Sequence, residues 1–327
     1  MPLHPLRVGV VGVGHLGSRH AQIYAAMAGV RLTAVCDTDP RKARAVATSL
    51  GCQAVTDYHE LFGLVDAVSL AVPTSLHAAI GRPLLRQGIH VLIEKPLCTT
   101  LAQANALIRA AHRSRRILQV GHVERFNTAL HTAMRYLTHP RFIEVDRLSP
   151  YPFRGTDVSV VLDVMIHDLD MLLLLVRSPV TRVDALGISV LSSTEDIANA
   201  RLEFASGCIA NLTASRVSDE SMRRIRVFQE DSYLSIDYKA QTVELARRIR
   251  TRIHRVNLPV TQRPPLQDEL AAFVRSIVRR RPPAVSGAAG RAAVALALRI
   301  ERALRRRRGQ SIIHGPYSTK HQIPSTK

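Results

Sequence analysis

Short apolar segments alternate with segments of helical period over the first third of the chain. The apolar segments are typical of buried β-strands because they are brief and rich in branched aliphatic residues; they cover residues 7–11, 31–36, 66–72, 90–93 and 117–121. Helical stretches lie at about residues 18–28, 78–87 and 101–113, and Asp39-Pro40 is typical of the cap and first turn of another helix. This alternation predicts an α/β fold with a doubly wound parallel sheet.

The pattern changes after Gly121. Helical stretches at residues 128–137 and 158–176 precede longer runs of alternating apolar and polar residues, at 182–191, 197–204, 208–217, 224–228 and 233–238. Successive strands with few helices between them predict a C-terminal α+β domain with a largely antiparallel, open-faced sheet. One face of that sheet must be covered by helices or by another subunit. We therefore expect domains at residues 1–122 and 123–309, followed by a polar tail at 310–327.

Length and composition are those of a globular protein. The chain has 327 residues, of which 46% are hydrophobic, enough for two domains with cores. No apolar run reaches membrane-spanning length and no secretory cleavage site follows the first strand, so we expect no membrane insertion and a cytoplasmic protein. The four cysteines are scattered without ligand spacing, which predicts reduced thiols and no metal site; they are Cys36, Cys52, Cys98 and Cys208.

The formal charge of +19 raises the question of nucleic-acid binding. From residue 240 onward there are 19 Lys and Arg against 4 Asp and Glu, so the excess is C-terminal. The runs at residues 279–281 and 305–308 lie at the ends of predicted helices, where cations meet the negative end of the helix dipole. No aromatic residues interleave with them to stack on bases. We therefore expect a solvated basic face or a patch that attracts an anionic substrate, and no nucleic-acid partner.

A glycine-rich turn connects the first strand to the first helix. Gly12-Val13-Gly14-His15-Leu16-Gly17 has the GxGxxG spacing, in which the glycines permit a tight turn, close approach of a pyrophosphate and helix-strand packing. Asp37 ends the second strand about twenty residues later, where an acid would bind the ribose hydroxyls. The sequence therefore predicts a Rossmann domain that binds NAD, because the carboxylate would repel the phosphate of NADP. Arg41 and Lys42 leave NADP open as an alternative.

Polar residues follow the ends of two more predicted strands. Pro73, Thr74 and His77 follow the third strand, and Glu94 and Lys95 follow the fourth. Ligands of doubly wound sheets bind beyond the carboxyl ends of the strands, so we expect these residues against the nicotinamide half of the cofactor. A capping or surface position is the alternative for His77.

A second chemical signal lies on the predicted helix at residues 158–176. Asp163 and His167 are four residues apart and therefore share a helix face. A carboxylate beside an imidazole orients it and raises its basicity, and histidine is suited to proton transfer near neutral pH. A surface ion pair is the alternative, but the apolar flanks argue against a solvated helix. Asp168 and Asp170 point elsewhere and are expected to be structural.

Together these motifs resemble the glucose-fructose oxidoreductase/inositol dehydrogenase family of NAD(P)-dependent sugar oxidoreductases, over residues 7–302. The resemblance rests on the glycine turn, Asp37, Pro73-Thr74 with His77, Glu94-Lys95-Pro96 and the helix with Asp163 and His167. It implies an N-terminal Rossmann domain, a second domain whose open sheet forms a subunit interface, and a reacting carbon surrounded by Lys95, Asp163 and His167. The segment 157–161 lacks the glycines that many members have there, which leaves the shape of the substrate pocket open.

Four further segments resemble the branch that contains UDP-N-acetylglucosamine 3-dehydrogenases; they are residues 121–127, 165–168, 195–201 and 211–216. In that branch the 3-hydroxyl of the sugar nucleotide is oxidised to a ketone, which an aminotransferase can convert to an amine for a diamino-sugar lipid A precursor. The resemblance implies a nucleotide-sugar substrate and a homo-oligomer, either dimer or tetramer. A dehydrogenase of a free sugar, inositol or other small polyol, and a non-catalytic NAD-binding regulator, remain alternatives.

Roles follow for the candidate residues. We expect His167 to act as acid/base, Lys95 to donate to the reacting oxygen and relay protons, and Asp163 to orient His167, although Lys95 remains an alternative base. Because a diphosphate calls for guanidinium donors, substrate contacts are also expected from Arg125, Asn127 and Arg154.

Overall fold

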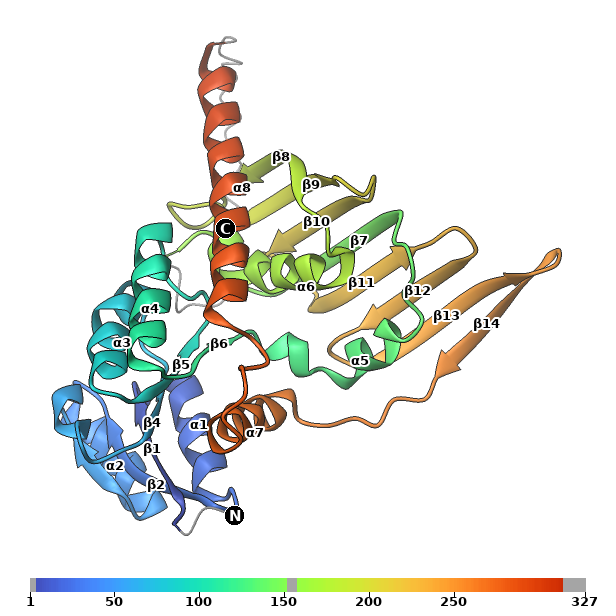
Figure 1. The fold of residues 1–327 in the computed structure, drawn as a ribbon. Coiled ribbons are helices and arrows are strands. Elements are labelled where there is room, and N and C mark those ends of the chain that lie inside the picture. Colours follow the sequence, from blue (N-terminus) through green and yellow to red (C-terminus); the bar gives the residue numbers. More distant parts are fainter. Residues whose placement is uncertain (1–3, 152–157, 314–327) are drawn as a thin grey trace, which may run out of the picture.

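The computed structural model describes residues 4–151 and 158–313, with side chains through residue 307. Two sheets organise the chain, a parallel one in the N-terminal part and a larger one in the second domain (Figure 1). Both expected sheet types are therefore confirmed.

The first sheet has six parallel strands in the order β3-β2-β1-β4-β5-β6. This is the strand order of a Rossmann domain, in which the chain reverses direction across the sheet between β1 and β4. The strands are β1 (Leu6–Val11), β2 (Val30–Cys36), β3 (Gln53–Val55), β4 (Ala67–Leu70), β5 (His90–Glu94) and β6 (Leu118–Gly121). Helices connect them: α1 (His15–Ala25), α2 (Pro40–Leu50), α3 (His77–Arg86) and α4 (Leu101–Ser114), with short 3-10 turns η1 (Tyr58–Leu61) and η2 (Thr74–Leu76).

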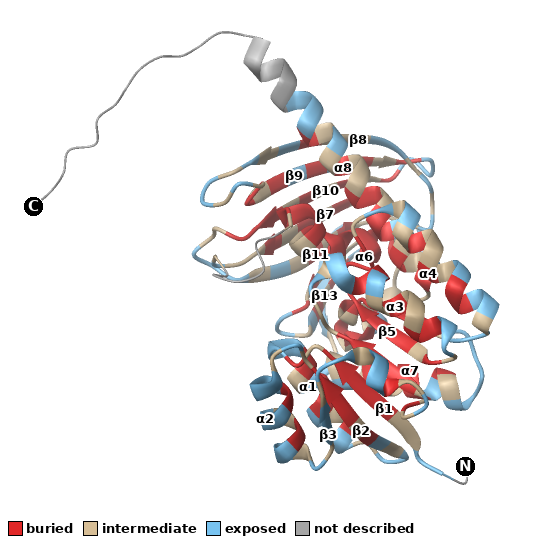
Figure 2. Cartoon of the chain, turned by 90° about the vertical axis from the view of Figure 1, so that its left-hand side faces the viewer, coloured by how far each residue is buried: buried red, intermediate tan, exposed pale blue. Residues whose placement is uncertain are grey.

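Burial on both faces of this sheet explains why the sequences of its strands are continuous apolar runs. Val8, Val10, Val68 and Val91 have no exposed surface because helices cover both faces (Figure 2). The local signals also agree with the prediction at α2, where the Asp39 carboxylate accepts the Arg41 backbone N–H at 2.9 Å. The type of most elements in this domain thus follows from sequence-local patterns, although β3 was not predicted.

Two helices from the C-terminal end of the chain complete the first domain. Phe273 of α7 (Pro265–Val278) is fully buried in the core around β1 and β2. Val285 accepts the Val120 backbone N–H at 3.0 Å, which joins the segment after α7 to β6. Helix α7 and the start of the next helix therefore pack in the cores of the first domain, although they follow the second domain in the chain.

Helix α8 (Gly287–Ile313) connects the two domains. Val294 packs in the core of the first domain, whereas Ala297 and Ile300 pack in the core of the second (Figure 1). The helix continues to Ile313, so the expected tail boundary at residue 310 falls inside it, and residues 305–308 do not end a helix as predicted. By contrast, Arg279 caps α7, as expected for a cation at a helix C-terminus.

The second sheet has eight strands in the order β14-β13-β12-β11-β7-β10-β9-β8. Only β7 and β10 run parallel, so the sheet is largely antiparallel as predicted. The strands are β7 (Phe142–Leu148), β8 (Val180–Ile188), β9 (Ile197–Phe204), β10 (Ile209–Ser215), β11 (Met222–Phe228), β12 (Ser232–Asp237), β13 (Thr242–Ile249) and β14 (Arg252–Leu258). The sequence patterns did not reveal β7, β13 or β14.

Helices cover one face of this sheet and leave the other open (Figure 1). The covering elements are the 3-10 turn η3 (Val123–Phe126), α5 (Thr128–Met134), the π-helical turn η4 (Val161–Met165), α6 (Ile166–Val176) and α8. Strand β9 shows the resulting alternation, since Ala200 and Leu202 are buried beneath the helices while Arg201 is exposed on the open face. The expected helix at 158–176 is thus divided into a π-helical and an α-helical part.

Candidate active site

The glycine turn has the shape that a bound pyrophosphate requires. Gly12 has a φ of +83°, and a Cβ there would lie 2.6 Å from the Ala71 carbonyl oxygen. A Cβ on Gly17 would collide with the Gly12 carbonyl, so α1 can pack on the turn only with glycine at this position. A Cβ on Gly14 would meet nothing within 4 Å. The turn is therefore packed on its inner side and open at Gly14, and His15 begins α1 there with its free N–H groups.

Asp37 lies beside this turn at the end of β2. Its carboxylate accepts the Val13 backbone N–H at 2.9 Å and the Asp39 backbone N–H at 3.0 Å. These bonds fix the carboxylate next to the glycine turn, where the ribose of a dinucleotide would lie. Arg41 and Lys42 are exposed at the start of α2, and Lys42 lies 3.9 Å from Asp39.

The residues predicted to follow β4 differ in their exposure to solvent. Pro73 and Thr74 stand in the exposed turn that leads into η2. His77 is only 1% exposed, and its ring nitrogens lie 2.9 Å from the Val72 carbonyl and 3.0 Å from the Pro96 carbonyl. Burial lowers the pKa of His77, so the neutral ring donates to one of these carbonyls at a time. His77 thus joins the loop after β4 to the loop after β5.

Lys95 reaches across from the Rossmann domain to the second domain. Its ammonium lies 2.7 Å from the backbone carbonyl of Asp163 and 3.0 Å from the Asp163 carboxylate. Glu94 is buried, accepts the Lys95 backbone N–H at 3.2 Å and lies 3.2 Å from the His20 ring. A Cβ on Gly121 would come within 2.9 Å of the Glu94 carboxylate, so a larger residue at the end of β6 would displace that carboxylate. These contacts hold the lysine at the strand end.

His167 lies in the same cleft as Lys95 but does not bond to Asp163. The carboxylate of Asp163 turns to Lys95, and the buried Nδ1 of His167 has no hydrogen-bond partner among the described residues. The expected role of Asp163 as orienter of His167 is therefore corrected, since the π-helical turn directs it to the lysine. Burial, together with the charges of Lys95 and Arg147, lowers the pKa of His167 well below its ordinary value. The ring is neutral at pH 7 and can accept a proton.

A network of buried ion pairs supports the wall behind His167. Arg147 of β7 donates two hydrogen bonds to Asp168, at 2.7 and 2.9 Å, and one to Glu124 at 3.0 Å. Its guanidinium also lies 5.9 Å from the ring centre of Tyr238. Sequence reasoning missed Arg147, although its inward place in the alternation of β7 marks it as a buried charge. Asp168 is structural, as expected.

Two of the three predicted substrate residues form hydrogen bonds with other groups of the protein. Arg125 forms two 2.6 Å hydrogen bonds with the fully buried Asp170, so its guanidinium is held by a carboxylate. Asn127 is 1% exposed, caps α5 through the Ala129 N–H and donates to the Tyr238 carbonyl at 3.0 Å. Both sets of contacts support the fold around the cleft, and Asn127 also lines it. Arg154 lies outside the described residues.

These side chains surround a cleft of about 500 Å³ between the two domains. Leu16 of the glycine-turn helix forms one wall, with Glu94 and Lys95 beside it. The opposite wall comes from the second domain and includes His167 and Tyr238. The remaining lining residues are Arg19, Gly121, Val123, Glu124, Asn127, Arg147, Arg223, Lys239, Gln241, Pro265 and Leu266. The arrangement brings a nucleotide-binding turn, a lysine and a neutral histidine to one opening.

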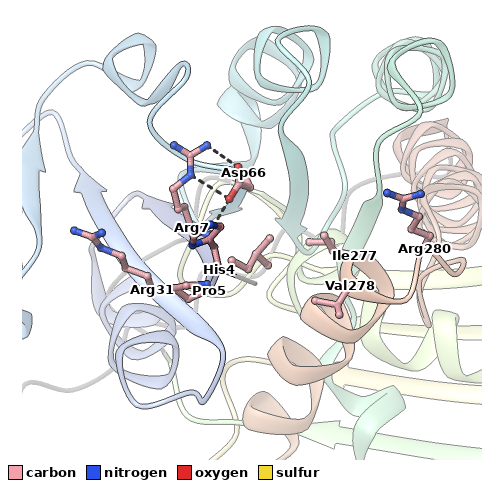
Figure 3. Close-up of a pocket in the computed structure, with 9 residues that line it drawn as sticks. His4, Pro5, Arg7, Arg31, Asp66, Ile277, Val278 and Arg280 are labelled. Carbon is pink, nitrogen blue, oxygen red and sulfur yellow. Dashed lines mark hydrogen bonds and ion pairs between the residues drawn. The ribbon is translucent and has the colours of Figure 1, made fainter. Parts of the chain in front are cut away.

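A larger hollow lies at the opposite edge of the first sheet (Figure 3). It has a volume of about 910 Å³, and Arg7 in its wall forms a 2.7 Å ion pair with Asp66. Ile277 and Arg280 close the side formed by α7. Because β1 begins here and ends at the glycine turn, this hollow is separated from Lys95 by the length of the sheet. It is therefore not the site of the chemistry described above.

Within the described residues, no group of three histidine, cysteine or acidic side chains could hold a metal ion. No helix in that part of the chain is long and apolar enough to cross a membrane. All four cysteines are free thiols, and burial raises the pKa of Cys98 and of Cys208 to about 11.

Profiles of a single protein family match both domains. Residues 6–122 match the Gfo/Idh/MocA oxidoreductase family with its NAD-binding Rossmann fold, and residues 129–235 match the C-terminal domain of the same family. The chain belongs to this family. It is an oxidoreductase that uses NAD as cofactor, and the predicted class and cofactor are confirmed.

Relatives with assigned activities are similar over nearly the whole chain. A UDP-N-acetylglucosamine 3-dehydrogenase from Acidithiobacillus ferrooxidans is 37% identical over 306 residues, which are 90% of this chain and 96% of the relative. Its solved structure has a TM-score of 0.88 and covers 92% of this chain and 98% of its own. A myo-inositol 2-dehydrogenase from Thermotoga maritima is 28% identical over 93% of this chain and 97% of the relative. A levoglucosan dehydrogenase in complex with NADH and levoglucosan, 18% identical with a TM-score of 0.84 over 93% and 98% of the two chains, shares the fold.

Proposed function

We propose that this protein oxidises the 3-hydroxyl of UDP-N-acetylglucosamine to a ketone and transfers the hydride to NAD⁺. The observation that carries the proposal is that Lys95, held by Asp163, and His167 line one cleft beside the glycine turn. The similarity to the UDP-N-acetylglucosamine 3-dehydrogenase supports the choice of substrate because it extends over both domains.

The cofactor would lie along the glycine turn and accept the hydride when bound. Gly14 leaves room for its pyrophosphate, and the N–H groups at the start of α1 would bind those phosphates. The Asp37 carboxylate would accept the ribose hydroxyls, which favours NAD over NADP. Pro73 and Thr74 would border the nicotinamide half, while His77 braces the loop that carries them.

His167 and Lys95 divide the proton chemistry of the substrate hydroxyl. His167 is neutral at pH 7 and accepts the hydroxyl proton as hydride leaves the same carbon. The Lys95 ammonium donates a hydrogen bond to the reacting oxygen and stabilises the negative charge that develops there. Asp163 holds the ammonium in that position through its carboxylate and its backbone carbonyl. Asp163 is thus a positioning residue for Lys95.

The wider context follows from the product. A 3-keto sugar nucleotide is a substrate for an aminotransferase, so the reaction would supply a diamino-sugar precursor of lipid A in the cytoplasm. We further propose that the open face of the eight-stranded sheet joins copies of the chain into a dimer or tetramer. That face carries cross-strand charge pairs such as Arg226 with Glu144 at 3.2 Å, which a self-complementary interface could extend.

The test is to incubate the protein with NAD⁺ and UDP-N-acetylglucosamine and to follow the absorbance of the reduced nicotinamide. We expect turnover, and mass spectrometry should find a product lighter than the substrate by two hydrogens. A panel of myo-inositol, glucose and other polyols is the comparison. Turnover of a polyol with no reaction of the nucleotide sugar would overturn the substrate assignment and leave the oxidoreductase class standing.

A further inference from the structure

Three cationic side chains line the mouth of the active-site cleft. Arg19 comes from α1, Arg223 from β11, and Lys239 follows β12; all three are exposed and border the cleft with His167. Among the described residues, neither the Arg19 nor the Lys239 side chain forms a hydrogen bond or ion pair. The closest acid to Arg223 is Glu124 at 3.9 Å, and Glu124 already accepts a 3.0 Å hydrogen bond from Arg147. The mouth therefore carries positive charge that the described residues leave largely unneutralised.

Backbone pairing places Arg223 and Lys239 together. The Tyr238 N–H donates to the Arg223 carbonyl at 2.9 Å, so Lys239, the next residue, lies at the same end of the β11-β12 pair. This end of the pair is the one that borders the cleft. Two cations from adjacent strands are thus directed to one opening, as a diphosphate with two negative groups requires.

The floor of the cleft offers uncharged polar groups that have no hydrogen-bond partner among the described residues. Tyr238 is 4% exposed and its hydroxyl has no hydrogen-bond partner among the described residues, and the same is true of the His167 Nδ1. These groups suit the hydroxyl and amide groups of a sugar ring. Beside His167 the cations Lys95 and Arg147 are paired with carboxylates, whereas the cations at the mouth have no such partner among the described residues. A free sugar or inositol would leave the cations without a partner, whereas a sugar diphosphate nucleotide would match both parts.

We propose that Arg223 and Lys239 bind the diphosphate of the nucleotide sugar and thereby select it over uncharged polyols. This inference rests on the function proposed above and specifies the residues that recognise its substrate. Arg19 faces the same opening from the helix that follows the glycine turn. Because Arg19 could also contact the diphosphate of the cofactor, it is not part of the test.

The test compares Arg223→Gln, Lys239→Gln and the double variant with the wild-type protein. Each single change should raise KM for UDP-N-acetylglucosamine roughly tenfold, because it removes a hydrogen bond between charged groups. The kcat and the Kd of NAD⁺ should stay within about twofold, since neither residue belongs to the glycine turn or to the Lys95–His167 pair. Raising the salt concentration should weaken substrate binding to the wild type more than to the double variant.

Arg113→Gln is the matched control, because it removes one exposed positive charge on α4 and leaves the cleft intact. Arg223→Lys should recover part of the lost affinity. An unchanged KM in the double variant, or an equal rise in KM in the Arg113 control, would overturn the inference while the function stands. A wild-type protein that neither binds nor oxidises UDP-N-acetylglucosamine, measured by calorimetry and turnover, would overturn both. Because Arg223 and Lys239 are exposed, the melting temperatures should match the wild type, which separates binding from folding.

Discussion

The ammonium of Lys95 and the carboxylate of Asp163 lie 3.0 Å apart, although they come from different domains. A second contact, at 2.7 Å, joins the same ammonium to the Asp163 backbone carbonyl. This pair fixes the lysine at the strand end and closes the Rossmann domain against the π-helical turn of the second domain. The relationship makes the position of Lys95 depend on the arrangement of both domains.

Removing this pair should show that Asp163 acts through Lys95. Lys95→Met should lower kcat by at least about a hundredfold, because it removes the donor to the reacting oxygen. Asp163→Ala should lower kcat by roughly tenfold, since the backbone carbonyl still holds the ammonium. In the Lys95→Met background, Asp163→Ala should have little further effect. Steady-state kinetics of the four proteins measure this coupling, and fully additive losses would contradict it.

The pH dependence of kcat/KM should report the low pKa of His167. Because the neutral ring is the proton acceptor, activity is retained at pH values above its pKa and is lost as the pH falls through it. Since that pKa is well below the ordinary value of 6.5, the acid limb should lie below pH 6.5. His167→Asn should lower kcat by roughly a hundredfold. The control is His112→Asn on the surface of α4, and an acid limb that persists unchanged in His167→Asn would assign it to another group.

Asp37 should determine the choice between NAD and NADP. Asp37→Asn keeps the size of the side chain and one acceptor oxygen but removes the charge that would repel a 2′-phosphate. The ratio of kcat/KM for NAD over NADP should fall by roughly tenfold or more. Asp39→Asn is the matched control, because Asp39 caps α2 and accepts the Arg41 N–H. Equal shifts in both variants would point to the charge of the region and not to Asp37.

Glu269 should make the stability of the first domain depend on pH. It is fully buried on α7 without a hydrogen-bond partner for its carboxyl oxygens, and burial followed by the charge of Glu94 raises its pKa well above 4.5. The folded state therefore keeps this proton while the unfolded state loses it above about pH 4.5. The resulting stability is present below that pH and is lost as the pH rises, by about 1.4 kcal/mol per pH unit.

Glu269→Gln should remove this dependence. As the pH rises from 5 towards the raised pKa of Glu269, the free energy of unfolding of the variant should therefore increase relative to that of the wild type. Denaturant unfolding at several pH values measures the difference. Glu230→Gln, at an exposed position, is the control for loss of one acidic group. Parallel pH profiles for the wild type and Glu269→Gln would show that Glu269 is not the responsible group.

Much of the first domain could be predicted because its signals are local. The glycine spacing, the strand that ends at Asp37 and the apolar run before Lys95 each lie within a short segment and reflect turn geometry or burial on both faces. The second domain was harder to predict. Strand β14 is almost entirely exposed, so no alternation of apolar and polar residues marks it.

The sequence by itself determined the family, the cofactor-binding turn and the edge of the sheet at which the chemistry lies. Only the tertiary structure decided the partners of the charged side chains. Lys95 and Asp163 are 68 residues apart and meet because the two domains pack together, whereas Arg125 and Asp170, 45 residues apart, meet through packing within the second domain. The same holds for α7, which fills the core of a domain that begins more than two hundred residues earlier. Periodicity records which side of an element is buried, whereas the choice of partner depends on the packing of segments distant in the chain.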